Sequence, residues 1–191
     1  MMNQATIALA GNPNAGKSTI FNALTGEHQH VGNWPGKTVE RKEGEFSING
    51  VTMNIIDLPG TYSLTAYSME EKITRDFLLQ NQPDAVVAVV DAANLERNLY
   101  LVVQMLELGV PIVIALNMAD MAESRGLKID TDQLAAGLNV PIIRTIATRN
   151  EGLEELKQTV AQAVQNRAHR PARSRTGDVS KHDAPRCPNC G

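Results

Sequence analysis

Cysteine, aromatic residues and long apolar runs are all scarce in this chain of 191 residues. Its two cysteines, Cys187 and Cys190, stand close to the C-terminal end, which argues against a small fold held by disulfide bonds and favours a reducing compartment such as the cytoplasm. No apolar run approaches the roughly 20 residues that a membrane-spanning helix needs. The N-terminal residues also lack the basic, apolar and small-residue segments of a secretory signal.

Positive charge is scarce outside the C-terminal end. The net charge is −3, yet residues 167–191 hold six Lys and Arg residues against two Asp residues. The remainder is therefore acidic, which argues against nucleic-acid binding by the main body of the chain. We expect one folded domain in residues 1–166 and a basic, flexible tail containing Pro, Ser and Arg in residues 167–191.

Apolar periodicity alternates along the chain between patterns typical of strands and of helices. We expect strands near residues 6–10, 38–48, 51–57, 84–91, 111–117 and 141–147, and helices near residues 18–26, 95–109, 130–138 and 151–166. Asn49-Gly50 favours a tight turn that makes its two flanking strands antiparallel neighbours. The predicted fold is α/β: a mostly parallel, doubly wound sheet with one antiparallel edge hairpin.

The most specific motif is "GNPNAGKS", which runs from Gly11 to Ser18 and matches the phosphate-loop pattern G-x-x-x-x-G-K-[ST] between a predicted strand and a predicted helix. Glycines let successive backbone N–H groups curl around phosphate oxygens at the positive end of the helix. Lys17 adds a mobile positive charge and the Ser18 hydroxyl a ligand for Mg²⁺. The predicted nucleotide contacts in this segment are Gly11, Asn14, Ala15, Gly16, Lys17, Ser18 and Thr19.

A second motif, "DLPG", begins where the predicted strand 51–57 ends. Asp57 is placed to help hold Mg²⁺, and the Gly60 N–H to meet a γ-phosphate. Because a parallel sheet gathers the carboxyl ends of its strands at one edge, we expect this motif beside the phosphate loop.

A third motif, "NMAD", selects the base. The Asp120 carboxylate can accept hydrogen bonds from the N1–H and amino groups of guanine, a donor pair that adenine lacks, so GTP is expected in preference to ATP. Asn117 can read the base and brace the phosphate loop, while Met118 stands where GTPases usually have a lysine. After the last strand, Ala147 and Thr148 are expected at the base, with the Ala147 backbone N–H as the main contact.

These motifs, in this order and at these spacings, resemble the translation-factor-like branch of P-loop GTPases. The segments "GNPNAGKST", "VGNWPGKTVERKEG", "DLPGTYSL" and "DAANLERNLYL" narrow the resemblance to the cytoplasmic G domain of FeoB, the bacterial ferrous-iron transporter. The similarity covers residues 5 to about 165. It implies a P-loop GTPase fold that binds GTP and GDP.

The resemblance also identifies residues 31–40 as the first switch, a loop that the γ-phosphate orders. It implies that Thr38 coordinates Mg²⁺ and that Trp34, Gly36 and Lys37 lie at the nucleotide, although Trp34 could instead anchor the loop on the core. It further implies a K⁺ ion held by the Asn14 side chain and the backbone carbonyls of Gly32 and Trp34; the alternative is that Asn14 only braces its own loop. Asn14, Lys17, Thr38 and Gly60 form the expected catalytic set.

The resemblance predicts a GTP-hydrolysing switch that serves a membrane iron permease, in the same longer chain or as a separate subunit, at the cytoplasmic face of the plasma membrane. Hydrolysis should be slow because Thr61 stands where Ras-type enzymes have a water-orienting glutamine. The alternative is a stand-alone nucleotide-binding regulatory module with incidental hydrolysis. Cys187 and Cys190 have the C-x-x-C spacing of half of a tetrahedral metal site. A second chain could supply the other half, so an oligomer is compatible with such a site.

Overall fold

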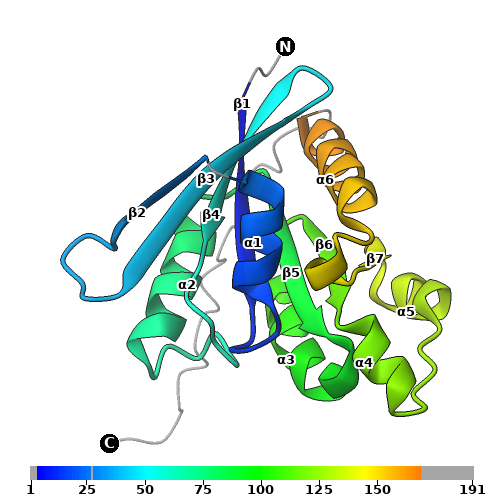
Figure 1. Ribbon diagram of the computed structural model, residues 1–191. Helices are drawn as coiled ribbons and strands as arrows, with labels where there is room; N and C mark the ends of the chain where they lie inside the picture. The colour runs from blue at the N-terminus through cyan, green and yellow to red at the C-terminus, as the bar shows by residue number, and fades with distance from the viewer. Residues whose placement is uncertain (1–3, 27, 169–191) are drawn as a thin grey trace, which may run out of the picture.

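The computed structural model describes residues 4–26 and 28–168, which form one seven-stranded sheet with helices on both faces (Figure 1). The elements follow one another as β1 Gln4–Gly11, α1 Lys17–Thr25, β2 Gln29–Asn33, β3 Glu40–Ile48, β4 Val51–Asp57, α2 Met69–Gln80, β5 Ala85–Asp91, α3 Leu95–Glu107, β6 Ile112–Asn117, α4 Ala119–Ser124, α5 Thr131–Leu138, β7 Ile142–Arg144 and α6 Leu153–Ala168. Short 3₁₀ turns, Ala92–Asn94 and Ala147–Arg149, precede α3 and α6.

The sheet has the strand order β2-β3-β4-β1-β5-β6-β7. Strands β4, β1, β5, β6 and β7 run parallel, whereas β3 is antiparallel to both β4 and β2. The sharp β3–β4 turn forms at Asn49 and Gly50, which both have positive φ angles, 51° and 76°. The parallel register aligns Leu9 with Asp57 and Gly11 with Val89, so the carboxyl ends of the central strands meet at one edge.

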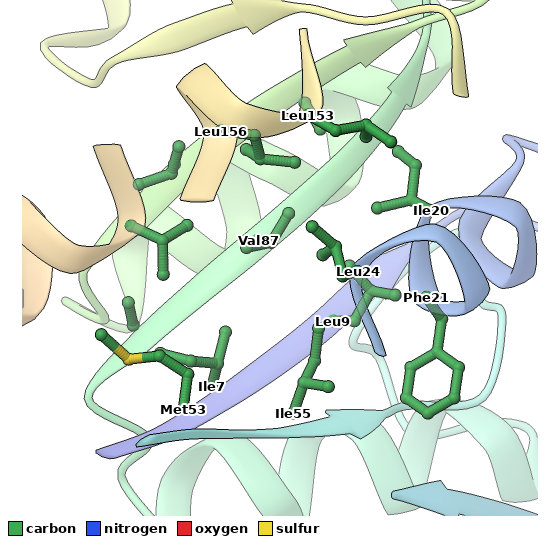
Figure 2. Packing of buried hydrophobic residues seen from close by; sticks show 14 of the residues in the cluster. Ile7, Leu9, Ile20, Phe21, Leu24, Met53, Ile55, Val87, Leu153 and Leu156 are labelled. Carbon is green, nitrogen blue, oxygen red and sulfur yellow. The ribbon is translucent and has the colours of Figure 1, made fainter. Parts of the chain in front are cut away.

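Successive side chains of a strand point to opposite faces of the sheet, so the apolar strands place apolar side chains on both faces. On one face, α1 and α6 cover β1 and β5; Figure 2 shows Phe21 and Leu24 of α1 and Leu156 of α6 packed with Ile7 and Leu9 of β1. On the other face, the buried residues of α2 and α3 pack against the opposite side of the same strands. The helices and sheet thereby fix the loops at the carboxyl edge of the sheet.

The predicted fold class is confirmed, and four elements differ from the sequence-based expectation. Strand β2 adds a second antiparallel strand at the edge, outside the predicted hairpin. Helices α2 and α4 were not predicted, although Ser68 and Glu71 form a capping box at the start of α2 that is visible in the sequence as S-x-x-E. Helix α6 runs to Ala168, two residues past the predicted domain boundary.

Among residues 4–26 and 28–168, none of the helices combines the length and the apolar character that a membrane crossing requires. The predicted tail from residue 169 onward, with Cys187 and Cys190, lies outside the described residues.

Candidate nucleotide-binding site

The phosphate loop joins the end of β1 to the start of α1 at the carboxyl edge of the sheet. Asn14 and Gly16 both adopt positive φ angles, 65° and 87°, which curl the backbone ahead of the helix. No side chain caps the N-terminus of α1, so its first N–H groups are left for an anion. Asn14, Ser18 and Thr19 are exposed there, whereas Ala15 is buried. The local geometry is that of an anion-binding loop, as the sequence predicts.

Lys17, the first residue of α1, forms an ion pair with Asp57, the last residue of β4. The Lys17 Nζ lies 2.5 Å from the Asp57 Oδ1, and the two side chains are 11% and 8% exposed. Burial raises the pKa of the Asp57 carboxyl above its ordinary value, and the nearby Lys17 ammonium only partly offsets this effect. The structure therefore brings together the predicted phosphate-binding cation and the predicted Mg²⁺ carboxylate.

The segment that contains Gly60 lies against the phosphate loop. The Leu58 N–H donates to the Leu9 carbonyl at 2.9 Å, and the Thr61 N–H donates to the Gly11 carbonyl at 3.2 Å. A side chain on Gly60 would place its Cβ 3.3 Å from the backbone of Pro13, a tight contact that only a small shift of the neighbouring loop could relieve. Gly60 therefore lies beside the phosphate loop, and its contact with a γ-phosphate stays a prediction.

Asn117 connects three loops at the end of β6. Its amide Nδ2 donates to the Ala15 carbonyl at 3.0 Å, and its Oδ1 accepts from the Ala147 N–H at 3.1 Å. The predicted bracing of the phosphate loop by Asn117 is observed. The Ala147 N–H differs from expectation: it was predicted to meet the base, but here it satisfies the buried Asn117 oxygen.

Asp120 lies in the first turn of α4 with its side chain 31% exposed. The Arg149 guanidinium comes within 3.8 Å of the Asp120 carboxylate, a neighbour that the sequence analysis did not identify because the two residues are far apart in the chain. Met118 has a positive φ of 58°, and its methyl group lies close to Gly16. Thr148 lies in the turn that starts at Ala147, and the contacts of Asp120, Met118 and Thr148 with a base stay predictions.

The first switch differs most from the sequence-based expectation. Residues 34–39 have no regular structure, as expected, but Gly32 and Asn33 end strand β2, in which Gly32 pairs with Arg41 of β3. The Trp34 carbonyl accepts from the Lys37 N–H at 2.9 Å. Figure 1 shows this β2–β3 connection to one side of the phosphate loop.

The Trp34 indole is buried and does not lie over the phosphate loop. Its ring meets the Phe77 ring of α2 edge to face at 5.6 Å, and the Arg41 guanidinium lies 4.8 Å from its centre. This placement supports the alternative that Trp34 anchors the switch on the core. Within the described residues, no hydrogen bond or ion pair joins Gly32, Trp34, Gly36, Lys37 or Thr38 to Asn14 or Ser18. Their contacts with nucleotide, Mg²⁺ and K⁺ stay predictions.

Comparison with known proteins agrees with this geometry. The family model described as "Ferrous iron transport protein B" matches residues 5–160. The Fe(2+) transporter FeoB of Escherichia coli K12 is 51% identical over 163 residues, which are 83% of this chain and 21% of that protein. The chain thus spans about a fifth of the length of the curated relatives that it matches.

Two solved structures are similar throughout the domain. The FeoB G domain from Methanococcus jannaschii is 49% identical, with a TM-score of 0.77 and coverage of 86% of this chain and 99% of that one. The cytosolic domain of T. maritima FeoB in its GMPPNP form is 48% identical, with a TM-score of 0.82 and coverage of 84% and 64%. The chain therefore belongs to the ferrous iron transport protein B family and corresponds to the part of that protein known as the G domain.

Proposed function

We propose that this chain is the GTP-binding and GTP-hydrolysing switch domain of a FeoB-type ferrous-iron transport system. The observation that carries the proposal is the position of Asn117, whose single amide joins the phosphate loop to the loop at Ala147, next to Asp120. A phosphate site and a guanine-selecting carboxylate are thereby held in one rigid frame. GDP and GMPPNP forms of the T. maritima relative support guanine nucleotides as ligands.

Guanine selection follows from the chemistry of Asp120. A carboxylate only accepts hydrogen bonds, and guanine offers two adjacent donors, whereas adenine would leave the carboxylate unpaired. Arg149, at 3.8 Å, forms only a loose pair with Asp120 in an exposed setting, where ion pairs contribute little. The carboxylate is therefore available to a base.

The residues around the phosphate loop fit a Mg²⁺ ion. Asp57 and the exposed Ser18 hydroxyl offer the oxygen ligands that Mg²⁺ prefers, and Thr38 would add a third from the first switch. When bound, Mg²⁺ neutralises negative charge on the phosphates. Lys17 would then exchange its partner Asp57 for phosphate oxygens, which frees the carboxylate oxygens for the metal.

Hydrolysis in this domain should be slow and K⁺-dependent. Thr61 supplies no amide to orient the attacking water, and its hydroxyl donates to the Ser63 carbonyl at 2.9 Å. The exposed Asn14 side chain is free to offer an oxygen to a cation beside the phosphates. The Gly32 and Trp34 carbonyls could join it only after β2 and the following turn rearrange. When bound, K⁺ would supply the positive charge that an arginine supplies in other GTPases.

GTP turnover at constant ionic strength in KCl and in NaCl tests this part of the proposal. We expect faster turnover in KCl, with the difference abolished in Asn14→Ala. Equal rates of GTP turnover in both salts would refute the proposed K⁺ site. GTP binding without turnover above background would instead favour the second candidate, a regulatory module with incidental hydrolysis.

The FeoB relatives indicate the kind of partner on which this domain acts. This chain covers 21% of the E. coli transporter, so we infer that it acts on a membrane iron-permease domain or subunit from the cytoplasmic face of the membrane. GTP and GDP states of the switch segments would be the signal that the partner receives.

A further inference from the structure

The segment from Thr61 to Ser68 has no regular structure and connects the "DLPG" motif at the end of β4 to the start of α2. Its first residue is fixed, because Thr61 is buried and its N–H donates to the Gly11 carbonyl. Its end is fixed by Glu71, whose carboxylate accepts from the Ser63 hydroxyl at 2.6 Å and from the Tyr67 N–H at 2.9 Å. The residues on either side of Ser63, Tyr62 and Leu64, contact a different element.

Helix α3 holds this part of the segment at two points. The Arg97 guanidinium stacks over the Tyr62 ring, 4.1 Å from its centre. Two turns further along the same helix, the Gln104 Oε1 accepts from the Leu64 N–H at 2.8 Å. The two contacts bracket Ser63, so they define the path of the backbone immediately after Thr61.

Helix α3 is a rigid support for these contacts. Leu101, Val102 and Met105 are almost fully buried against the sheet, in the same cluster as Leu64. Arg97 and Tyr62 are both exposed, and Gln104 is half-buried, so neither contact is part of the core. Exposed cation–π contacts and single neutral hydrogen bonds are weak, which suits a segment that must move between nucleotide states.

We propose that Arg97 and Gln104 are positioning residues for GTP hydrolysis, because they fix the backbone from Tyr62 to Leu64 relative to the phosphate loop. The inference rests on the proposed GTPase function. Since Thr61 offers no water-orienting amide, the attacking water depends on the placement of the backbone around it. Small displacements of this segment should therefore lower kcat without changing how the nucleotide is bound.

Steady-state GTP turnover with parallel measurement of GDP affinity tests this inference. We expect Arg97→Ala and Gln104→Leu each to lower kcat about three- to fivefold while KM for GTP and the affinity for GDP stay unchanged. Arg97→Lys should recover part of the loss, because an ammonium can still lie over the Tyr62 ring. Glu107→Gln, at the exposed end of α3, is the matched control and should behave as the parent chain.

A double-substitution cycle separates positioning from general destabilisation. If Arg97 acts through Tyr62, Arg97→Ala should have no further effect on kcat in a Tyr62→Leu background. Independent, multiplied losses, or a kcat that is unchanged or raised in both α3 variants, would overturn the inference. Failure of the parent chain to bind or hydrolyse GTP would instead refute the proposed function, so the two failures are distinguishable.

Discussion

The side-chain amide of Asn117 donates to the carbonyl of Ala15, 102 residues earlier in the chain, at a distance of 3.0 Å. Both groups are buried, and the same amide accepts from the Ala147 N–H. Gly16 allows this arrangement, because a Cβ at that position would collide with the Asn117 amide nitrogen. One side chain thus sets the distance between the phosphate loop and the region proposed for the base.

Removal of this amide should damage both stability and binding. Asn117→Ala leaves the Ala15 carbonyl and the Ala147 N–H unpaired in a buried site, which should cost about 1–3 kcal/mol of unfolding free energy and most of the GTP affinity. Denaturant unfolding and nucleotide titration measure the two effects.

Asn98→Ala is the matched control for Asn117→Ala. Asn98 is also a buried asparagine with two backbone hydrogen bonds, to the Asp91 N–H and the Asn94 carbonyl, but it lies in α3. The Asn98→Ala variant should lose about as much unfolding free energy as Asn117→Ala but keep the nucleotide affinity of the parent chain. Equal losses of affinity in both variants would mean that the effect of Asn117 is only structural.

Base specificity should reverse when Asp120 is changed. Asp120→Asn replaces an acceptor by an amide, which should cost about 2–4 kcal/mol of GTP affinity and favour xanthosine nucleotides, whose O2 can accept from that amide. Competition titrations with GTP and XTP measure the change. Glu123→Gln on the same helix is the control, and retention of parental GTP affinity by Asp120→Asn would disprove the placement of the base.

Trp34 should report rearrangement of the first switch. It is the only tryptophan in the chain, and it is buried against Phe77 in the structure described above. If Thr38 must reach Mg²⁺ when GTP is bound, the packing of Trp34 must change, and its emission should shift to longer wavelength with GMPPNP and Mg²⁺ but not with GDP. Identical Trp34 emission with GMPPNP and with GDP would mean that Trp34 keeps the same packing in both nucleotide states.

The ionised carboxylate of Glu71 should contribute to the free energy of unfolding, and this contribution should be lost at acid pH. Its hydrogen bond from Ser63, the largest cause, and those from Tyr67, Ser68 and Thr65 hold the pKa of its carboxyl below the ordinary 4.5. A lowered pKa in the folded state stabilises the protein above the ordinary pKa, and this contribution disappears as the pH falls through the lowered value.

The free energy of unfolding of the parent chain and of Glu71→Gln should therefore differ at neutral pH and converge in the acid range. Denaturant unfolding over a pH series measures this difference, and Glu70→Gln controls for removal of a charge from the same helix turn. A difference that persists unchanged to the lowest pH would exclude the carboxylate as its source.

The sequence predicted the parts of the site that depend on local backbone chemistry. The phosphate loop, Asp57 and Gly60 were found because each directly follows an apolar strand, and a parallel sheet brings such ends together. Helix α2 was not predicted, although its capping box, Ser68 and Glu71, is a local signal for the start of a helix. Neither Arg149 beside Asp120 nor Arg97 over Tyr62 has a local signal, since these contacts exist only after distant segments pack.

The start of the first switch, Gly32 and Asn33, differs from the expected loop for a different physical reason. Gly32 and Asn33 have low strand propensity, but β3 offers an unpaired edge whose backbone groups stabilise any neighbour that can align with it. The burial of Trp34 against Phe77 adds to this pairing. Tertiary contacts therefore decided the conformation of a segment whose local composition favours a loop.

Calorimetric titration of the chain with GTP and with ATP, both in the presence of Mg²⁺, tests the central claim most directly. We expect GTP to bind with one site per chain, ATP not to bind at the same concentrations, and Lys17→Ala to lose GTP binding. Equal binding of ATP and GTP would contradict the assignment of Asp120, and an absence of binding by either nucleotide would contradict the account as a whole.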